Sequence, residues 1–462
     1  MRKVRISKAI LMTGAGLVLA MGGAGLTLAR AATETHQVVT GPISEYWITT
    51  STSSGMNMAA MTGGGGGGRP SMAAMMDMMK GGVSHTMRLQ LGSTQAASGD
   101  PNADHLPPTV LDVGNDLPLY YKAAVTQAVQ SSGGGGSQSS GGQSPDAQPQ
   151  QAQPPKGKIL IFWGCGEHAP QGQPVVLDLS QLADPSARMG MMAKMAPQPV
   201  TLDTVHPPSP ERWKSYGEWP NAKSSTGLDA NSSLLGAHVV KGNYSPDINF
   251  TVAQSQDFLA PIQISGNARD ASGAVPLQWQ AMSGARGLFI SVIGSGGKGA
   301  DGGPILVMWT SAQVQLGWGG LTADYLTPHD ADRLLTSKVL LPGETTACTV
   351  PAEVASPGGS QAANLIYSMT AYGGETNYAY PPRPDDPKVP WNIQWETKVR
   401  YRSATGGMLG RIMGGNGAMA MGGGTAAASG SSSSAASDQK KKNSMFGDLI
   451  KSRLGAVIPG GG

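Results

Sequence analysis

Residues 391–402 read Trp-Asn-Ile-Gln-Trp-Glu-Thr-Lys-Val-Arg-Tyr-Arg. Every second residue from Trp391 to Tyr401 is apolar or β-branched, and every second residue from Asn392 to Arg402 is polar or charged. Side chains of a β-strand point alternately to the two faces of its sheet. The segment therefore predicts a strand with one face in a core and the other in water, and it favours a fold built from β-sheets.

Short strands fill the rest of residues 158–405, which we interpret as the main domain. Runs typical of buried strands occur at 158–163, 175–179, 248–252, 262–264, 305–310 and 365–372, and long helical periodicity is nearly absent before residue 443. Residues 277–293 place a Trp-bearing strand, a short turn and a Phe-bearing strand in succession, similar to a hairpin of fibronectin-like and immunoglobulin-like sandwiches. The predicted class is all-β, with one or more β-sandwiches.

A smaller β region is expected at 32–130. Its strands at 42–50 and 85–91 flank a Met- and Gly-rich tract at 54–83, which we interpret as a long loop inserted in a hairpin. The region either forms a small domain or completes a sheet of the larger one. The tracts at 131–157 and 406–442 contain little apolar surface to bury, so they predict flexible linkers.

The first 31 residues have the features of a secretory signal peptide. Four basic residues precede an uncharged stretch at 9–29, and Ala29-Arg30-Ala31 is a small-x-small cleavage signal. The stretch is also long enough to span a bilayer, so an uncleaved anchor is the alternative, which its five glycines disfavour. We expect an exported protein of the periplasm or cell envelope.

Loss of this segment changes the charge balance. The chain has 33 Lys and Arg residues against 30 Asp and Glu residues, and five of the basic residues lie within 1–31, which holds no acidic residue. The mature chain therefore carries 28 basic and 30 acidic residues, a net charge of −2. Such a chain has no general attraction to nucleic acid, which is not an expected partner.

The segment Trp163-Gly164-Cys165-Gly166-Glu167-His168 is the most distinctive one. A thiol three residues from an imidazole is compatible with a nucleophile and its base, or with two metal ligands. The two cysteines of the chain, Cys165 and Cys348, both belong to the exported part. There a disulfide persists, whereas an unpaired thiol is prone to oxidation. We expect Cys165 and Cys348 to form a disulfide, with the glycines allowing a turn after a strand.

The same segment carries a resemblance. Its Trp-Gly-Cys-Gly-Glu run, with Gly-Gln-Pro-Val-Val at 172–176 and Pro-Pro-Arg-Pro at 381–384, resembles uncharacterised exported bacterial proteins. That group carries no assigned activity, so the resemblance implies no function.

Methionine is unusually frequent, with 24 residues, of which 21 follow the signal segment. Thioethers are soft ligands that select Cu(I), and the periplasm is where copper is handled. A copper site would draw on Met56, Met58, Met61, Met72, Met75, Met76, Met78, Met79 and His85, and a third methionine cluster lies at 189–195. Alternatively, these methionines form an adaptable surface or a loop without a ligand. We expect no cofactor, with copper as the alternative.

Trp213, Tyr216 and Trp219 follow one another in a Pro-flanked segment. Exposed aromatic rings present an apolar face with a polar edge and stack on sugars, and polysaccharide lies nearby in the envelope. Alternatively, such rings attach a long loop to a sandwich. These three residues are the candidates for ligand stacking.

The C-terminal segment predicts a short amphipathic helix at 443–459. Apolar residues including Phe446, Leu449, Ile450 and Leu454 recur at intervals near 3.6, and Pro459 ends the run. A helix on a flexible tether can reach an envelope protein, a polysaccharide or a membrane surface, which are the expected partners. Alternatively, it folds back onto the domain or frays.

Motifs of common enzymes are absent from the sequence. It contains no G-x-S-x-G and no H-E-x-x-H, and the glycine-rich run at 294–299 lacks the Ser or Thr that follows Lys in a phosphate loop, so we expect a hairpin turn there. We conclude that the chain is a non-catalytic periplasmic or envelope protein that binds or scaffolds a ligand. The first alternative is a copper-binding protein. The second is a cell-wall hydrolase that uses Cys165 or an acidic pair.

Overall fold

The computed structural model describes residues 37–55, 82–124, 156–195, 200–221, 228–317, 320–357 and 364–410. All of them belong to the first of two compact units, 1–412 and 413–462. The predicted signal peptide and C-terminal helix lie outside the described residues. So do most of the Met- and Gly-rich loop and most of both predicted linkers.

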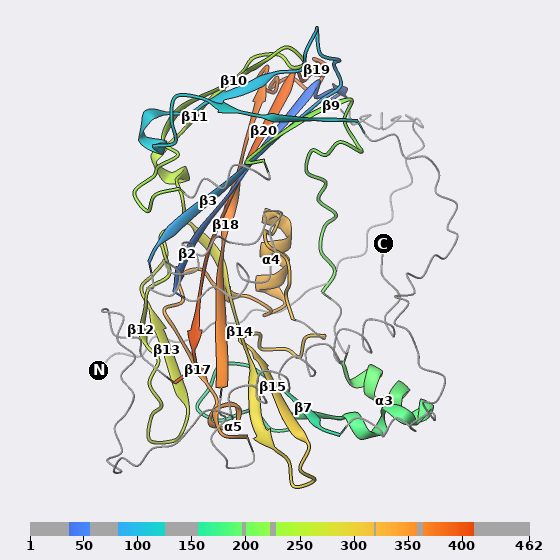
Figure 1. Cartoon of the computed structure of the whole chain (residues 1–462), viewed down its shortest axis with the longest axis vertical. Coiled ribbons are helices and arrows are strands. Elements are labelled where there is room, and N and C mark those ends of the chain that lie inside the picture. The colour runs from blue at the N-terminus through green and yellow to red at the C-terminus, as the bar shows by residue number, and fades with distance from the viewer. Residues whose placement is uncertain are drawn as a thin grey trace, which may run out of the picture. The chain divides into compact units, whose positions relative to one another are not determined.

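Strands dominate the described residues, which confirms the predicted β class. The longest sheet has 11 strands in the order β6-β9-β3-β2-β20-β18-β14-β15-β7-β8, and β16 pairs with β14. Figure 1 shows β2, β3, β18 and β20 side by side. The strands are β2 (Ser44–Gly55), β3 (Ser84–Ser93), β6 (Tyr120–Ala123), β7 (Lys158–Trp163), β8 (Val175–Asp178), β9 (Ser215–Trp219), β14 (Ala285–Lys298), β15 (Pro304–Thr310), β16 (Leu341–Pro342), β18 (Asn364–Tyr380) and β20 (Trp395–Met408).

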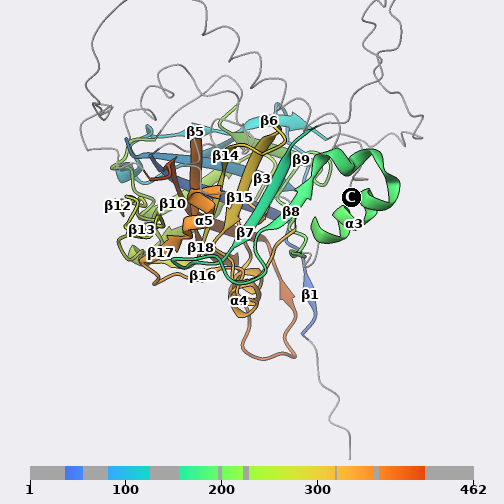
Figure 2. The same ribbon diagram turned by 90° about the horizontal axis from the view of Figure 1, so that it is seen from below.

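Three smaller sheets accompany the large one. The four-stranded sheet has the order β11-β10-β4-β5, the three-stranded sheet β12-β13-β17, and the two-stranded sheet β1-β19; Figure 2 shows β12, β13 and β17 together. Their bounds are β1 (Val39–Thr40), β4 (Ala103–Leu106), β5 (Leu117–Pro118), β10 (Gly236–Gly242), β11 (Ile248–Val252), β12 (Ile264–Gly266), β13 (Val275–Trp279), β17 (Ala347–Val350) and β19 (Trp391–Asn392).

Helices among the described residues are short. They are α3 (Pro185–Met195), α4 (Pro328–Thr336) and α5 (Ala352–Ala355), with 3₁₀ turns η1 (Thr109–Leu111), η2 (Leu179–Ala183) and η3 (Gln254–Gln256). Within the described part of the chain, no helix is long and apolar enough to cross a membrane.

The N-terminal strands complete the large sheet. β2 and β3 pair antiparallel, as the predicted hairpin requires. β2 also pairs in parallel with β20, over the register from Ser44 beside Trp395 to Gly55 beside Gly406. Of the two arrangements that the sequence left open for this region, the strands adopt the second.

The predicted hairpin at 277–293 is wrong. β13 pairs with β12 and β17, whereas β14 pairs with β15, β16 and β18. A turn signal specifies where the chain bends but not which strand lies beside the next one. Here the chain leaves one sheet and enters another. The glycine-rich run at 294–299 does lead into a hairpin, between β14 and β15, although residues 294–298 still belong to β14.

One face of the large sheet lies in the main core. Val399 and Tyr401 of β20 are buried there with Ile48 and Leu89, next to apolar residues of the smaller sheets such as Leu277. Full burial of each such side chain contributes roughly 1.5–3 kcal/mol. The opposite face of β20 is not in open water, contrary to the prediction, because Arg400 is only 7% exposed.

A buried hydrogen-bond chain joins the four-stranded sheet to the large sheet. The Tyr46 hydroxyl lies 2.8 Å from Nδ1 of His105, whose Nε2 lies 3.2 Å from Nδ1 of His238, and Nε2 of His238 lies 2.6 Å from the carbonyl oxygen of Leu234. A carbonyl only accepts, so Nε2 of His238 carries a proton. Since the lowered pKa values keep both imidazoles neutral, His105 donates to His238 and Tyr46 donates to His105.

A disulfide joins Cys165 to Cys348, as predicted, with 5.3 Å between the Cα atoms. Gly164, at a φ of 90°, turns the chain at the end of β7. Its carbonyl accepts a hydrogen bond from Trp309 Nε1, and Gly166 N donates to the Thr349 carbonyl. The bond therefore links the large sheet, at the end of β7, to β17 of the three-stranded sheet.

Acidification should destabilise the protein through the buried imidazoles. Burial lowers the pKa of His105 and of His238 below the ordinary value of 6.5, and His238 lowers that of His105 further. Since the unfolded chain then binds more protons, stability is complete above about pH 6.5 and falls below it, by about 1.4 kcal/mol per pH unit for each histidine. Urea denaturation from pH 7.5 to 5 measures this slope. His238→Gln keeps a donor and an acceptor but does not titrate, so it should reduce the slope; an unchanged slope would contradict the assignment.

Loss of the disulfide should lower stability strongly. The bond closes a separation of 183 residues, for which removal is expected to cost about 2–5 kcal/mol. We expect the double variant Cys165→Ser, Cys348→Ala to show this loss in urea denaturation. Dithiothreitol should reduce wild-type stability to the same level and leave the double variant unchanged. Two alkylated thiols in the intact mass of unreduced protein would contradict the bond.

Candidate functional site

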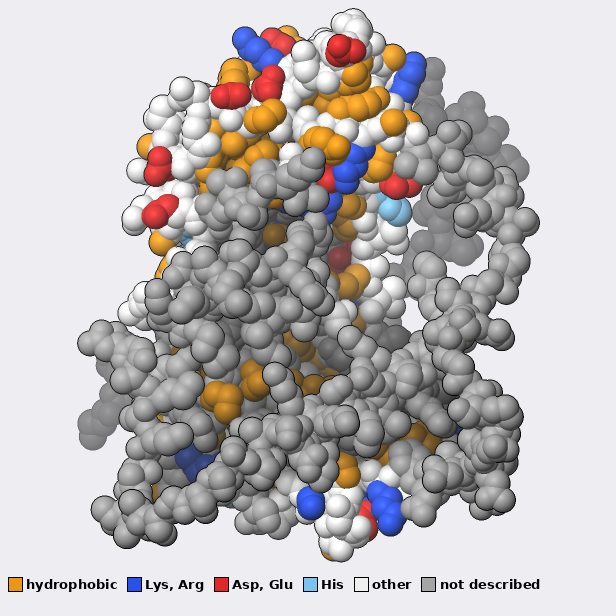
Figure 3. Space-filling view, in the orientation of Figure 1, with side chains coloured by type: hydrophobic (Ala, Val, Ile, Leu, Met, Phe, Trp, Pro, Cys, Tyr) orange, Lys and Arg blue, Asp and Glu red, His pale blue; other side chains and the backbone are white. Residues whose placement is uncertain are grey.

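The face of the large sheet opposite the main core is lined by charged and aromatic side chains. The parallel register sets Trp47 beside Lys398, Thr49 beside Arg400 and Ser51 beside Arg402. We define this polar face by Glu45, Trp47, Thr49 and Ser51 of β2, Arg88 and Gln90 of β3, Glu218 of β9, Glu375 of β18, and Glu396, Lys398, Arg400 and Arg402 of β20, with Asp324 and Tyr325 over it. On the side from which Figure 1 is viewed, basic and acidic side chains lie next to one another in the upper half (Figure 3).

Arg400 lies at the centre of the polar face. Its side chain is 9% exposed, and its guanidinium lies 5.4 Å from the ring centre of Trp47 and 5.2 Å from that of Tyr325. Nε is 3.5 Å from Oε2 of Glu375. Burial lowers the pKa of the Arg400 guanidinium, and Glu375 opposes this effect; the group nevertheless stays charged, as arginine does in proteins.

Hydrogen bonding of Arg400 is incomplete. Among the residues that the structure describes, its Nε and Nη2 atoms, and Oε2 of Glu375, are buried without a hydrogen-bond partner. A small movement would let Nε donate to Glu375, but it would still leave Nη2 unpaired. Buried donors without a partner are uncommon, and each one needs a physical explanation.

Two further cations flank Arg400 on β20. Lys398 Nζ donates to Oε1 of Glu375 at 2.7 Å and lies 5.2 Å from the Trp47 ring centre. Arg402 pairs with Asp324 and donates from Nε to Ser51 Oγ. Arg400 and Lys398 thus share Glu375, whereas Arg402 has Asp324. The charge of Lys398 also acts on Glu45 and Glu396, and it lowers the pKa of both carboxyl groups.

Glu218 forms a second charged group at the β9 side of the face. It accepts hydrogen bonds from Arg88 at 3.1 Å and from the Tyr216 hydroxyl at 2.7 Å, and it pairs with Lys122. Burial alone would raise the pKa of Glu218, but these three partners outweigh it and leave the pKa lowered. Here too two cations share one carboxylate.

Glu45 and Glu396 lie side by side where β2 and β20 begin. Burial raises the pKa of both carboxyl groups. A hydrogen bond from Trp47 Nε1 to Glu45 opposes the rise, and the Glu396 charge adds to it. The structure thus brings together an acidic pair that the sequence did not reveal.

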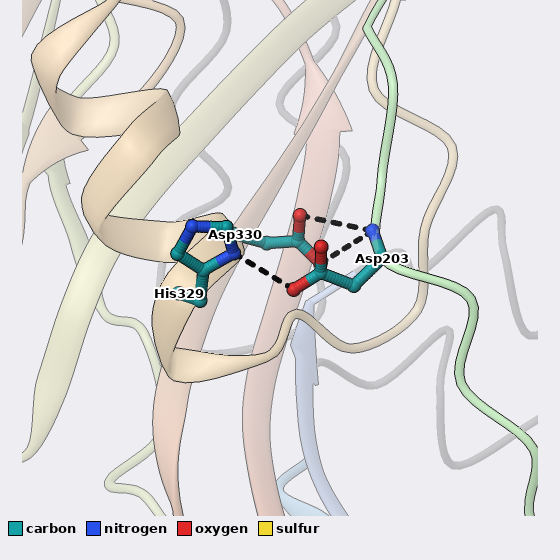
Figure 4. A group of neighbouring side chains, drawn as sticks. All are labelled: Asp203, His329 and Asp330. Carbon is teal, nitrogen blue, oxygen red and sulfur yellow. Dashed lines mark hydrogen bonds and ion pairs between the residues drawn. The ribbon is translucent and has the colours of Figure 1, made fainter. Parts of the chain in front are cut away.

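The first turn of α4 and the segment at 200–203 together hold a group with the composition of a metal site. Ligand atoms of Asp203, His329 and Asp330 all lie within 4.8 Å of one another. Figure 4 shows His329 Nδ1 directed at the Asp203 carboxylate and the Asp203 backbone N–H directed at Asp330. The His329 hydrogen bond, followed by that of Thr327, lowers the pKa of Asp203.

The same carboxylate oxygens already have donors. Asp330 accepts from Arg333 at 2.5 Å and from Asp203 N, while its own N–H donates to Thr327 Oγ1 at the N-cap of α4. A cation would have to displace a guanidinium and an imidazole. The group is therefore best explained as the cap that attaches segment 200–203 to α4.

The prediction that Trp213, Tyr216 and Trp219 form an exposed stacking surface is wrong. Tyr216 and Trp219 belong to β9 and are 1% and 5% exposed. Trp213 is half-buried, with its ring so close to Gly92 that a Cβ there would lie 2.5 Å from it. The rings attach segment 213–219 to the sheet, which was the alternative interpretation.

Cys165 is not a free nucleophile, because it is bonded to Cys348, and the nearby His168 pairs with Glu353 at 3.1 Å on the surface. For copper, the eight methionines of 56–79 lie outside the described residues. The remaining candidate, His85, has both ring nitrogens in hydrogen bonds, Nδ1 to Thr52 Oγ1 and Nε2 to the Ala230 carbonyl. Phe446, Leu449, Ile450 and Leu454 also lie outside the described residues.

Comparison with known proteins does not identify a family or a function for the chain. The chain matches no protein-family model and no curated protein. Among solved structures it is similar to the mu homology domain of Fcho1 from Danio rerio with bound Eps15 peptide, at 8% sequence identity and a TM-score of 0.18, over 80% of this chain and 98% of that chain. At that TM-score the similarity indicates neither the fold nor a function.

Removal of the shared carboxylate should show how much the polar face depends on it. Glu375→Gln leaves Arg400 and Lys398 without their counterion in a site where the Glu375 side chain is 6% exposed. We expect a loss of roughly 3 kcal/mol in the free energy of unfolding, with part of it recovered in the double variant Glu375→Gln, Arg400→Met.

Glu353→Gln is the matched control. It breaks an ion pair whose side chains are 65% and 45% exposed, so it should cost less than about 1 kcal/mol. Urea denaturation of the three variants makes the comparison. Equal losses at Glu375 and Glu353 would show that the polar face holds no buried ion pair.

Proposed function

We propose that the protein is an exported, non-catalytic binding or scaffolding protein of the periplasm or cell envelope, and that the polar face is its binding surface. One observation carries the proposal. Arg400 is held nearly buried between Trp47 and Tyr325 with donors that no described group accepts. Convergent polar groups with unmatched donors are typical of a ligand site rather than of a core.

A cell-wall hydrolase is the second candidate, on a specific observation. The pair Glu45 and Glu396 has the raised pKa values that suit a general acid and its partner. The first candidate accounts for more of the face, because it includes the cations as well as the acids. Copper binding through the methionines of 56–79 has no support from the described residues.

We also propose that the sheets pack in a sandwich-like arrangement. The large sheet shares one core with the four-stranded and three-stranded sheets, which supports a sandwich-like packing of sheets without the fibronectin-like hairpin. We further propose that the helix at 443–459 contacts an envelope protein, a polysaccharide or a membrane surface.

The binding role is tested by co-sedimentation of the full chain with purified envelope polysaccharide. We expect binding without release of soluble sugar, and a large loss of binding in the double variant Arg88→Gln, Lys398→Gln. Lys298→Gln, at the exposed end of β14, is the control and should bind as wild type. Sugar release that disappears in Glu396→Gln would favour the hydrolase. Equal binding by the two variants would show that the polar face is not the surface used.

A further inference from the structure

The carboxylates nearest to Arg400 are already paired with other cations. Each carboxylate near it already has a cation of its own: Asp324 pairs with Arg402, Asp330 with Arg333, and Glu375 with Lys398. Glu375 is left as the shared partner of two cations. Among the described residues, Nε and Nη2 of Arg400 are left without a hydrogen-bond acceptor, and donors so deeply buried favour an acceptor such as an oxyanion beside them.

The acidic pair cannot supply that anion. Glu396 precedes Arg400 by four residues on the same strand, a distance of about 13 Å along β20 at 3.3 Å per residue. Glu45 lies beside Glu396. Glu218, on the other side, is shared by Arg88 and Lys122. Lys398, between Glu396 and Arg400 on β20, is the cation that acts on the acidic pair, so neither Glu45 nor Glu396 supplies an acceptor for Arg400.

Thr49 marks the centre of the cationic part. In the sheet it lies between Arg400 on β20 and Arg88 on β3, each one strand away. Adjacent strands are about 4.8 Å apart, so a small group above Thr49 lies one strand from each of these residues. The Arg88 guanidinium, which pairs with Glu218 on β9 at 3.1 Å, would turn toward such a group. Thr49 is half-buried, and the side chains of Arg88 and Lys398 on either side of it are 41% and 26% exposed.

We infer that the polar face binds an oxyanion group, a carboxylate or a phosphate, above Thr49, held by the guanidinium of Arg400 and by Arg88. The inference rests on the proposed binding function and names the chemistry of its ligand. Guanidinium groups bind both oxyanions with two parallel N–H donors, which matches the unpaired Nη2 of Arg400. The rings of Trp47 and Tyr325 orient the guanidinium, so little rotamer entropy is lost on binding.

Spectra of the arginine Nε–H groups of the wild-type full chain test the inference directly. Inorganic phosphate and glucuronate are titrated separately at constant ionic strength, with chloride and neutral glucose as controls. We expect the Arg400 resonance, assigned through Arg400→Lys, to shift in a saturable way with one of the two oxyanions. Whichever anion acts identifies the source as a phosphate or a carboxylate. No saturable shift with either would overturn the inference.

Substitutions at Arg400 and Arg88 measure the contribution of each residue to anion binding. By calorimetry, Arg400→Lys keeps the charge but loses the paired donors, and Arg88→Gln removes the exposed partner; each should weaken binding of the active anion roughly 10- to 100-fold. Arg383→Gln, which removes an exposed guanidinium over Trp391, should leave the affinity unchanged. Should Arg400→Lys fail to fold, calorimetry of the wild-type chain and of Arg88→Gln with the two anions still decides. Equal weakening in all three variants would contradict a specific site.

The two experiments distinguish failure of the oxyanion site from failure of the proposed binding function. Wild-type chain that sediments with envelope polysaccharide but shows no anion-dependent shift refutes the oxyanion and leaves the binding function standing. Wild-type chain that does neither refutes both.

Discussion

The parallel pairing of β2 with β20 is the constraint on which the rest of the structure depends. It joins residues about 350 positions apart along the chain and lies in the middle of the 11-stranded sheet. A slip of one residue would move Val399 out of the core and Arg400 into it, so the two faces specify the register strongly. The same register sets Thr49 beside Arg400 and thereby creates the polar face.

The smaller sheets attach to this frame by polar as well as apolar contacts. The hydrogen-bond chain from Tyr46 through His105 to His238 ends on a carbonyl, so with neutral rings it has one direction only. It requires neutral imidazoles in a fully buried setting, and the lowered pKa values agree with that requirement. Together with the disulfide at β17, it connects elements that no local sequence signal pairs.

Burial of charge separates the polar face from an ordinary solvated surface. A row of solvent-exposed Lys and Arg side chains would contribute little to stability and would not indicate a binding site. Here Tyr325 lies over Arg400 and Arg402, and its hydroxyl donates to the Thr50 carbonyl, which ties segment 324–325 to the sheet. The cost of desolvating these groups is large enough that incomplete pairing at Arg400 calls for a partner outside the described residues, and an oxyanion meets that need.

The sequence predicted those features of the fold that depend on neighbouring residues, and it missed those that depend on contacts far along the chain. Period-two alternation in 391–402 depends only on neighbouring residues, so it predicted the β class and much of β20, although the single strand expected there is divided at residues 393–394 into β19 and β20. The count of two cysteines, in a chain expected to be exported, likewise predicted the disulfide. Partners of strands depend on contacts far along the chain, which is why the hairpin at 277–293 was wrong and the place of β2 stayed open. The polar face escaped prediction for the same reason. Alternating Lys398, Arg400 and Arg402 are typical of a face in water, and only Tyr325 and Glu375, brought from distant segments, bury them. Local periodicity determined which side of β20 each residue faces, and tertiary packing decided which of those sides meets solvent.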